Sequence, residues 1–432
     1  MKHTARLTPW LNWSGKTLVN RWSFLFIQTD AWISPVKFAT KKTALFENIF
    51  LKSKLNGLSK IFLPIKNTQC NMKNTYLVFL ALIVISCSDN FNNRLDSFFS
   101  KSFHENEPGG AVLILKGDKV VFSKAYGLAD LQTKEKITAQ TLFNTGSISK
   151  TFVSNTILAL ALENKLSLND SLTKYFTDFK NPEISNKVRI HHLLTHTSGL
   201  PDNRWLLLDS VFLLTAKDEE NFAPIKQNDS LLFEPGSRFE YSNPAFNGLA
   251  LIIEKVTGKK WQEVVKEKIL NPAGMTNTVI TDGPFPERGV SHAYLKTHQG
   301  FIEKDYGEEP TFAAAGNGGV WSSTEELMKY ELAIRKAAFL NQEVINQSRT
   351  VKEYQNWAGN EKPFIGYSWF IGKTEDGAKM IYHTGTQGGF YGDFVSIPEK
   401  GIIYIMLCNI PTPQEEKRNE VLRLLNEFNW LE

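Results

Sequence analysis

Hydrophobic positions after residue 90 are spaced first for a helix and then for two strands. Apolar residues at 91, 95, 98, 99 and 103 recur at helical spacing. Two apolar runs then flank KGDK in PGGAVLILKGDKVVFSKAYGLAD, which predicts a β-hairpin with a Gly-containing turn. From 147 to 166, apolar residues again recur every three or four positions, so this stretch predicts a helix packed against a core.

The middle of the chain predicts helices and its end predicts strands. From about 167 to 330, helical segments mix with loops rich in Gly, Pro and Asn, and NGLALIIEKVTGKKWQEVVKEKIL indicates two amphipathic helices parted near TGKK. From 364 to 409 strand-like runs return, and the apolar spacing after 413 predicts a closing helix. Strands at both ends predict one α+β domain, in which the two ends complete a shared sheet around a helical insertion.

Composition and charge limit the class of protein. The chain has 432 residues, of which 42% are hydrophobic and 22% charged, so it can bury a sizeable core. The formal charge is +4, but residues 1–71 hold eleven Lys or Arg and two acids, a net of +9. The remainder therefore carries −5. No nucleic-acid partner is expected for the globular part.

Three scattered cysteines give no disulfide framework and no zinc ribbon. Cys408 lies in the apolar run IIYIMLCN, which is typical of a core position. Cys87 ends MKNTYLVFLALIVISC, in which a charged start precedes an apolar run and a small residue. This order predicts a secretion signal, and the run is too short to span a bilayer. A buried helix or strand with a chance cysteine is the alternative.

The ending VISC resembles the lipobox of bacterial lipoproteins. The resemblance implies a lipid on Cys87, a membrane as partner through that anchor, and a place in the bacterial cell envelope facing the periplasm. A signal cannot act from position 72, so we expect Met72 to be the true start and residues 1–71 to come from an over-long gene model. A basic transit segment is the alternative. The expected division is 1–71 extension, 72–86 signal peptide, 87–105 tether and first helix, and 106–432 globular domain.

The stretch FNTGSISKTF holds the first candidate chemistry. Asn144 or Thr145 can cap a helix there, and Gly146 permits a tight turn. Ser147 and Lys150 are three residues apart, so they share a helix face. Burial and the positive helix N-terminus both lower a lysine pKa. A neutral lysine so placed can accept the proton of the serine, the pattern of an activated nucleophile.

Two further motifs separate this pair from the chance match of Ser171 and Lys174. YSN stands at 241–243 and HTG at 383–385, whereas SDN at 88–90 precedes the serine and belongs to the segment after the lipobox. The order of the three motifs resembles the signature of the penicillin-binding protein and serine β-lactamase superfamily. HHLLTHTSGLPD, EPGSRFEYSNPAFNGLALIIEKVTGKKW, AAAGNGGVWSSTEELMKY and YHTGTQGGFYGDFVSIPEKGIIYIMLCN are similar to other segments of it, so the resemblance covers about 106 to 430.

The tyrosine in the second motif resembles the class C β-lactamase-like branch, which includes D,D-carboxypeptidases, D-aminopeptidases, esterases and β-lactamases. The resemblance implies an antiparallel sheet flanked by helices, a mainly helical subdomain, and an active site between them, so 106–432 is expected to be a serine hydrolase domain. It implies neither cofactor nor metal. The expected substrates are peptides of the peptidoglycan type, amides, esters or β-lactams.

The resemblance also assigns roles to single residues. Ser147 becomes the acylated nucleophile, and Lys150 and Tyr241 share general acid/base work, with the base for acylation left open. The substrate-binding residues are Asn243, which would hold the substrate amide and Lys150, and the strand residues His383, Thr384, Gly385 and Thr386. The backbone N–H groups of Ser147 and Thr386 would form the oxyanion hole.

His383 departs from the lysine that many relatives carry. A histidine is largely neutral at pH 7, so it anchors a substrate carboxylate weakly, and we expect poor β-lactam hydrolysis at best. Alternatives are a β-lactam-hydrolysing enzyme and a non-catalytic scaffold lipoprotein. His192 and His196 lie four apart but lack the His-Glu-x-x-His pattern, so we expect them to be structural. The absence of Gly-x-Ser-x-Gly argues against an α/β-hydrolase.

Overall fold

The computed structural model describes the chain after the expected signal segment. The described residues are 90–202, 204, 215–282, 285–303, 315–357 and 364–431, and they belong to one compact unit. The expected upstream extension, the signal peptide and the lipidated Cys87 lie outside them. Among the described residues, no helix combines the length and the apolar character needed to cross a membrane.

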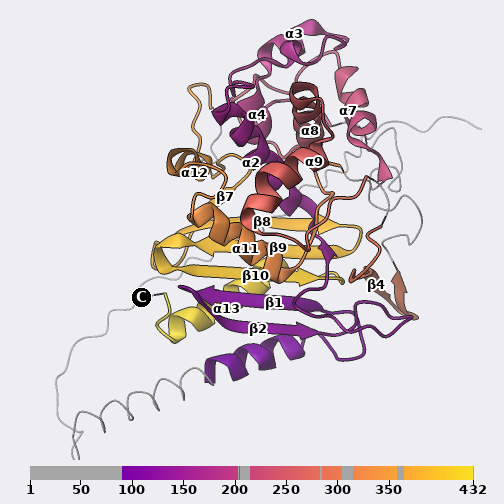
Figure 1. The fold of residues 1–432 in the computed structure, drawn as a ribbon, viewed down its shortest axis with the longest axis vertical. Coiled ribbons are helices and arrows are strands. Elements are labelled where there is room, and N and C mark those ends of the chain that lie inside the picture. The colour runs from indigo at the N-terminus through magenta and orange to yellow at the C-terminus, as the bar shows by residue number, and fades with distance from the viewer. Residues whose placement is uncertain are drawn as a thin grey trace, which may run out of the picture. The chain divides into compact units, whose positions relative to one another are not determined.

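A central sheet joins the two ends of the described chain (Figure 1). Its six strands are antiparallel, in the order β2-β1-β10-β9-β8-β7. Their bounds are β1 (Gly110–Lys116), β2 (Lys119–Tyr126), β7 (Phe370–Lys373), β8 (Lys379–Gln387), β9 (Phe390–Ile397) and β10 (Ile402–Cys408). Gly110 of β1 lies opposite Cys408 of β10. The predicted hairpin and the predicted sheet shared by both chain ends are therefore confirmed.

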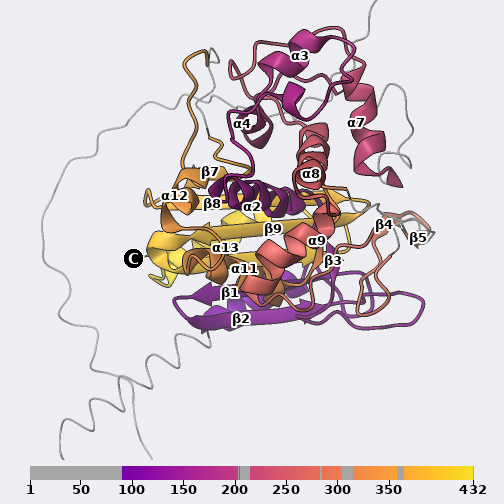
Figure 2. The same ribbon diagram turned by 45° about the horizontal axis from the view of Figure 1, so that its top comes forward.

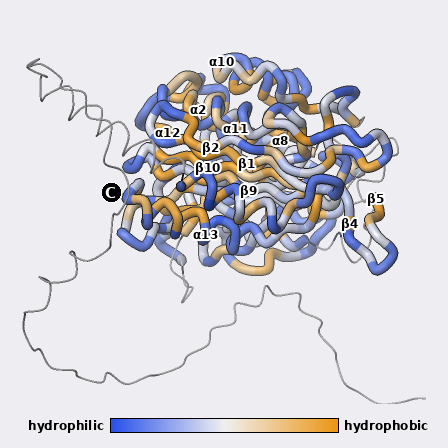
Figure 3. Tube along the Cα trace, turned by 90° about the horizontal axis from the view of Figure 1, so that it is seen from below, coloured by the Kyte–Doolittle hydropathy of each residue, from blue (hydrophilic) through white to orange (hydrophobic). Residues whose placement is uncertain are grey.

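Alternating residues of the strands divide the core into two clusters. On β1, Leu113 and Leu115 join one cluster, whereas Val112 and Ile114 join the other, as the two-residue period of a strand requires. The first cluster includes α2 (Ser149–Leu162), α8 (Asn243–Thr257) and α11 (Thr324–Arg335). Helical residues 90–100 and α13 (Gln414–Glu427) cover the other face. Figure 3 shows the hydrophobic strands between α11 and α13.

A mainly helical region lies on the α2 side of the sheet (Figure 2). It contains α3 (Pro182–Lys187), α4 (Ile190–Leu194), α7 (Asp218–Lys226) and α8. Gly258, at φ 70°, ends α8, and α9 (Trp261–Val265) follows, so the predicted break near TGKK is confirmed. A π-helical turn (Lys266–Leu270) and α10 (Asn271–Ala273) continue α9. Shorter elements are β3 (Phe143–Asn144), β4 (Tyr294–Thr297), β5 (Gly300–Glu303), β6 (Trp321–Ser322) and α12 (Gln342–Ser348).

Two predicted element boundaries differ from the structure. The helix expected to start at 147 begins at Ser149, after a 3-10 turn, η1 (Gly146–Ile148). In PFIGYSWFIG only β7 is a strand, because the run first folds into a turn in which Ser368 has φ 67° and the N–H of Gly366 donates to the Trp369 carbonyl. Apolar periodicity does not reveal such a turn. The α+β fold itself, an antiparallel sheet flanked by helices with a helical subdomain, is confirmed.

A buried ion pair fixes α13 against β9. Arg418 donates from Nε and Nη2 to the two carboxylate oxygens of Asp393, each at 2.9 Å, and both side chains are buried. Arg418→Met leaves this carboxylate buried without its partner, so we expect the free energy of unfolding to fall by about 3–5 kcal/mol in chemical denaturation. The matched control is Arg423→Met on the exposed side of α13, with an expected change of about 0.5 kcal/mol. Equal losses would contradict this assignment.

Candidate active site

The nucleophile candidate lies in a turn that two backbone segments hold in place. Ser147 is the middle residue of η1, directly before α2. The Gly146 N–H donates to Asn144 Oδ1 at 2.8 Å, and the Thr145 N–H donates to the Val320 carbonyl at 2.9 Å. Asn144 therefore caps the turn, as its residue type allows, although it is not the N-cap of α2. These two hydrogen bonds thus hold the backbone of the two residues that precede Ser147.

Lys150 points back at the serine, as the three-residue spacing predicts. Its Nζ donates to Ser147 Oγ at 2.9 Å and to the Asn317 carbonyl at 2.7 Å. The lysine has no exposed surface. Burial, with a smaller effect from the positive charge of Arg204, lowers the Lys150 pKa well below its ordinary value. The predicted direction of this shift is confirmed, and it favours a lysine that can accept a proton.

Tyr241 completes the surroundings of the serine hydroxyl. The Lys150 ammonium nitrogen lies 5.1 Å from the Tyr241 ring centroid. Although 37% of the tyrosine surface is exposed, burial by the surrounding protein raises its pKa, and the contact with the Ser147 hydroxyl opposes that rise in part. Tyr241 is therefore a neutral hydroxyl next to the serine, able to pass a proton on.

His196 is a site residue whose position sequence reasoning missed. Its ring stacks on Tyr241 with centroids 4.3 Å apart and an interplanar angle of 24°. Its Nδ1 accepts the Ser242 N–H at 3.0 Å, and burial lowers its pKa well below the ordinary value. The N–H therefore lies on Nε2, and the neutral ring supports the tyrosine from behind. The motif HTSGL contains this histidine, but no local pattern shows what it stacks on.

The other histidine of that pair is used differently. His192 accepts the Arg189 N–H on Nδ1 at 3.1 Å, at the start of α4. Across the described ranges, no group of three or more His, Cys, Asp or Glu side chains is placed to hold a metal ion. Both histidines thus accept backbone hydrogen bonds on Nδ1, and His196 in addition stacks on Tyr241.

Asn243 begins α8, directly after Ser242, whose Oγ caps the helix by accepting the Ala245 N–H at 3.3 Å. The expected contact with Lys150 is not among the hydrogen bonds of the described residues. Lys150 uses the Asn317 carbonyl instead. Asn243 is half-buried, two residues after Tyr241.

The third motif lies on β8, with alternate side chains on opposite faces. His383 follows Ile381 on the face of the α2 cluster, and Thr384 follows Tyr382 on the α13 face. His383 is 1% exposed, and its Nδ1 donates to the Thr384 carbonyl at 2.6 Å. Burial, then the nearby Lys150, lowers its pKa to about 3. A neutral ring in the physiological range follows, as expected, but it is covered rather than open to solvent.

Two glycines let the serine turn touch the strand. A Cβ on Gly385 would lie 1.9 Å from the Thr145 carbonyl oxygen and 3.3 Å from the Ser147 nitrogen. A Cβ on Gly146, which has φ 51°, would lie 2.6 Å from the Thr386 nitrogen. The backbone nitrogens of Ser147 and Thr386, which are expected to form the oxyanion hole, therefore lie where the serine turn touches β8. The Thr386 side chain lies on the α13 face of β8, like that of Thr384. Only the backbone N–H of Thr386 can therefore contribute to the oxyanion hole.

Gly385→Ala is expected to lower the rate of Ser147 acylation by about 10²–10³-fold, as loss of one oxyanion donor does. The added methyl group overlaps the Thr145 carbonyl, so β8 must move away from the serine turn. Acylation by a fluorophosphonate probe gives the rate. The matched control is Gly372→Ala on β7, where a Cβ would meet only side-chain ends at 3.1 and 3.5 Å. An unchanged rate in Gly385→Ala would contradict the oxyanion assignment.

The decoy serine–lysine pair is excluded by its contacts. Lys174 donates to Asp170 Oδ2 at 2.8 Å, and its side chain is 54% exposed. Ser171 bridges Arg189 in an isolated backbone pair. This lysine is paired with a carboxylate on the surface, and it lacks the burial that distinguishes Lys150.

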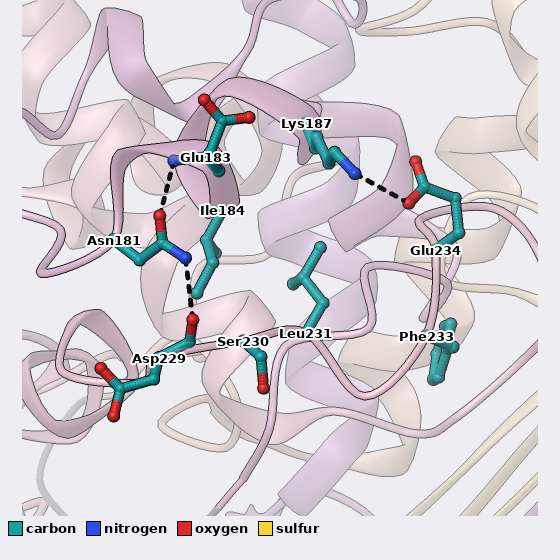
Figure 4. A pocket seen from close by; sticks show the side chains of 9 residues that line it. All are labelled: Asn181, Glu183, Ile184, Lys187, Asp229, Ser230, Leu231, Phe233 and Glu234. Atoms are coloured by element: carbon teal, nitrogen blue, oxygen red, sulfur yellow. Dashed lines mark hydrogen bonds and ion pairs between the residues drawn. The ribbon is translucent and has the colours of Figure 1, made fainter.

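A groove on the helical region is separate from these motifs. It is lined by α3 and the segment 229–234, and none of the motif residues belongs to it. Figure 4 shows Lys187 paired with Glu234, and Asn181 bonded to Glu183 and Asp229. Lys187, the cation of this groove, is therefore already paired within the protein. The candidate chemistry remains with Ser147.

Comparisons with known proteins agree with this arrangement. The family model described as Beta-lactamase matches residues 95–427. Protein flp of Staphylococcus aureus (strain MW2) is 28% identical over 313 residues, which are 70% of this chain and 60% of that protein. The chain therefore spans less than two thirds of the length of this relative.

Solved structures show the same fold. The octameric penicillin-binding protein homologue from Pyrococcus abyssi is 28% identical with a TM-score of 0.67, covering 78% of this chain and 77% of that one. D-amino acid amidase from Ochrobactrum anthropi SV3, complexed with L-phenylalanine amide, is 19% identical with a TM-score of 0.67, covering 80% and 99%. At the latter identity the likeness concerns the fold alone.

Proposed function

Because the chain belongs to the Beta-lactamase family, we propose that it is a serine hydrolase that forms an acyl-enzyme on Ser147 and hydrolyses peptide, amide or ester substrates. One observation carries the proposal. A lysine with no exposed surface and a lowered pKa donates to Ser147 Oγ at 2.9 Å. A desolvated lysine beside a hydroxyl is the arrangement that activates a serine nucleophile.

The acylation step follows from these contacts. Neutral Lys150 accepts the Ser147 proton on Nζ while Oγ forms a bond to the substrate carbonyl carbon. The negative charge that develops on the carbonyl oxygen faces the N–H groups of Ser147 and Thr386. When the tetrahedral intermediate collapses, the bond to the leaving group breaks, and this group takes a proton from the Tyr241 hydroxyl or from Lys150. The result is an ester on Ser147 and a released amine or alcohol.

Hydrolysis of the acyl-enzyme uses the same groups in reverse. A water molecule gives its proton to neutral Lys150 as its oxygen bonds to the acyl carbon, either directly or through the Tyr241 hydroxyl, which passes one proton to Lys150 as it takes up another. Collapse breaks the ester bond, returns a proton to Ser147 Oγ and releases the carboxylic acid. The neutral state of both groups at the start of each step is consistent with the lowered Lys150 pKa and the raised Tyr241 pKa.

The substrate class is argued from β8. His383 is neutral above pH about 4 because its pKa is lowered to about 3, and its ring is covered. It therefore supplies no permanent cation for a substrate carboxylate. Neutral amides and esters fit this surface better than β-lactams, whose carboxylate would lack an anchor. The names of the relatives, a penicillin-binding protein homologue and a D-amino acid amidase, support amide or peptide chemistry.

The test is a hydrolysis panel of D-amino acid amides, short nitrophenyl esters and nitrocefin. We expect turnover of amides or esters that disappears in Ser147→Ala, persists in the decoy control Ser171→Ala, and exceeds nitrocefin turnover. Fast steady-state turnover of nitrocefin would overturn the substrate proposal. Turnover that survives in Ser147→Ala would overturn the nucleophile, and a complete lack of turnover and of probe labelling favours a scaffold protein.

We also propose a lipid anchor on Cys87 and a location in the bacterial cell envelope, supported by the lipobox-like VISC sequence. Acyl chains then provide membrane affinity. Expression of the chain from Met72, the expected start, followed by membrane fractionation tests this. Cys87→Ser is expected to move the protein from the membrane to the soluble fraction, whereas the control Ser88→Ala is not. Equal distribution of the two variants would overturn the anchor.

A further inference from the structure

The loop that carries Asn317 is held by a buried acid outside the three motifs. The Gly316 N–H donates to Asp218 Oδ1 at 2.8 Å. Asn247, on α8, donates from Nδ2 to the same carboxylate oxygen at 2.8 Å and to Asn317 Oδ1 at 3.0 Å. Asp218 and Asn247 are both buried. One carboxylate oxygen thus fixes the loop directly through Gly316 and indirectly through Asn247.

The other end of the same loop is bonded to the serine turn. The Val320 N–H donates to Ser149 Oγ at 3.0 Å, and the Val320 carbonyl accepts from the Thr145 N–H at 2.9 Å. The loop also has no room to shift toward α8, since a Cβ on Gly316 would lie 2.7 Å from Ala250 Cβ. The loop is therefore a rigid connection between α7, α8 and the nucleophile.

This connection ends on the catalytic lysine. Lys150 Nζ has two hydrogen-bond partners, Ser147 Oγ and the Asn317 carbonyl. The carbonyl fixes where the nitrogen lies, and a displacement of the loop would draw Lys150 away from the serine. Positioning within a fraction of an ångström is what such proton transfers need.

We propose that Asp218, together with Asn247, is a positioning residue that holds the Asn317 carbonyl against Lys150 and thereby sets the rate of Ser147 acylation. The inference rests on the proposed function of Ser147. Asp218 does not touch the reacting atoms. It acts through the loop, so its effect must appear on the acylation rate rather than on the identity of the modified residue.

The ionisation of Asp218 gives this role a distinct signature. Burial raises its pKa to about 7, the N–H donors of Asn247 and Gly316 oppose the rise, and Glu254 of α8 adds to it. Its neighbours in α7 are engaged elsewhere, Lys217 with Asp282 and Glu219 with Lys226. Lys150, whose pKa is lowered by burial, is the titratable group at the far end of the loop.

The hydrogen bonds from Asn247 and Gly316 are both donated to Asp218, and a charged acceptor binds N–H donors more strongly than a neutral one. The loop is therefore held best when Asp218 is ionised. Below pH about 7 the carboxyl takes up its proton and the hold weakens. We expect the acylation rate to rise with pH through a step near 7 that belongs to Asp218.

Stability changes in the opposite direction. A carboxyl whose pKa is raised on folding binds more protons in the folded state, so stability falls as pH rises from about 4 to about 7. Ionised Asp218 therefore destabilises the protein at pH 8. Asp218→Asn removes the charge but keeps the shape of the side chain and an acceptor oxygen. If Asp218 only supported packing, loss of its charge would not improve the stability of the protein at pH 8.

The experiment measures the rate of fluorophosphonate labelling of Ser147 and the Tm, from pH 5.5 to 8.5, in the full chain. For Asp218→Asn we expect labelling at pH 8 to fall about fivefold, as a charged hydrogen bond becomes neutral, the step near pH 7 to disappear, and the Tm at pH 8 to stay equal or rise. Asp218→Ala leaves two donors unpaired and is expected to label more slowly still. The control, Asp178→Asn, removes an acid that is 61% exposed and is expected to behave as wild type.

Three results would overturn the inference. One is an Asp218→Asn variant that keeps the wild-type rate and pH step. Another is a lowered rate accompanied by a parallel loss of Tm at pH 8, which would make the role purely structural. The third is wild-type protein that does not label on Ser147 at any pH, which would overturn the proposed function and this inference with it.

Discussion

Lys150→Met is expected to slow acylation of Ser147 by about 10²–10⁴-fold, the usual contribution of a positioned general base. Methionine fills the buried space of the lysine stem but accepts no proton and makes no hydrogen bond to Ser147 Oγ, which the lysine contacts at 2.9 Å. Time courses of fluorophosphonate labelling measure the effect. The matched control is Lys174→Met, which removes the exposed lysine of the decoy pair and is expected to leave the rate unchanged.

The same substitution should not cost stability at pH 7. The Lys150 pKa is lowered on folding, so the unfolded chain binds a proton that the folded chain lacks, and wild-type stability rises with pH toward the ordinary lysine pKa of about 10.4. The Tm of Lys150→Met is therefore expected to equal or exceed that of wild type at pH 7, with the difference narrowing toward pH 10. A large loss of Tm with a retained labelling rate would contradict the assignment of Lys150 as the base.

Tyr241→Phe is expected to lower turnover of an ester or amide substrate by about 10²–10⁴-fold. The ring that stacks on His196 at 4.3 Å is kept, and only the hydroxyl that contacts Ser147 is lost. The Tm should hence change little. Turnover is measured with a nitrophenyl ester and with an amide. A larger loss of turnover on the amide than on the ester indicates that Tyr241 protonates the leaving nitrogen.

The control for the tyrosine is Tyr354→Phe. Tyr354 is also in contact with a histidine ring and a hydroxyl, Thr195 Oγ1 at 3.1 Å, but it lies outside the motif residues. We expect wild-type turnover from this variant. If Tyr241→Phe kept full activity on both substrates, proton transfer in both steps would have to rest on Lys150 alone.

The parts of the fold that sequence predicts are those with a local period. The continuous apolar run that includes Val112 to Leu115 predicts a strand of the hairpin, and the three-residue spacing of Ser147 and Lys150 reveals a shared helix face. Both relations survive tertiary packing because backbone geometry fixes them. Apolar spacing does not define the exact helix start, because a 3-10 turn and an α-helix have nearly the same spacing, so the prediction includes residues of η1 in the helix.

The parts that sequence does not predict depend on segments far apart in the chain. Asp218 and Gly316 are 98 residues apart, and Asn247 and Asn317 are 70 apart. Neither pair has a period or a motif that would connect it. The same holds for the Asn317 carbonyl, which replaces the expected Asn243 side chain as a partner of Lys150, because a backbone acceptor is independent of residue type.

His383 shows a third kind of limit. Its residue type predicts a neutral side chain, and the pKa of about 3 agrees. Its exposure is decided by packing against neighbouring segments, such as β7, where the Phe370 ring lies 5.2 Å from the His383 ring. Sequence therefore predicts its charge state, whereas only the structure reveals that the ring is covered.

Acylation at Ser147 is tested by intact-protein mass spectrometry after incubation with a fluorophosphonate, followed by peptide mapping. The expected result is a single adduct on the peptide that contains Ser147, absent from Ser147→Ala and formed far more slowly in Lys150→Met. An adduct on Ser171 or on another residue, or equal labelling of wild type and Ser147→Ala, would contradict the assignment of Ser147 as the nucleophile.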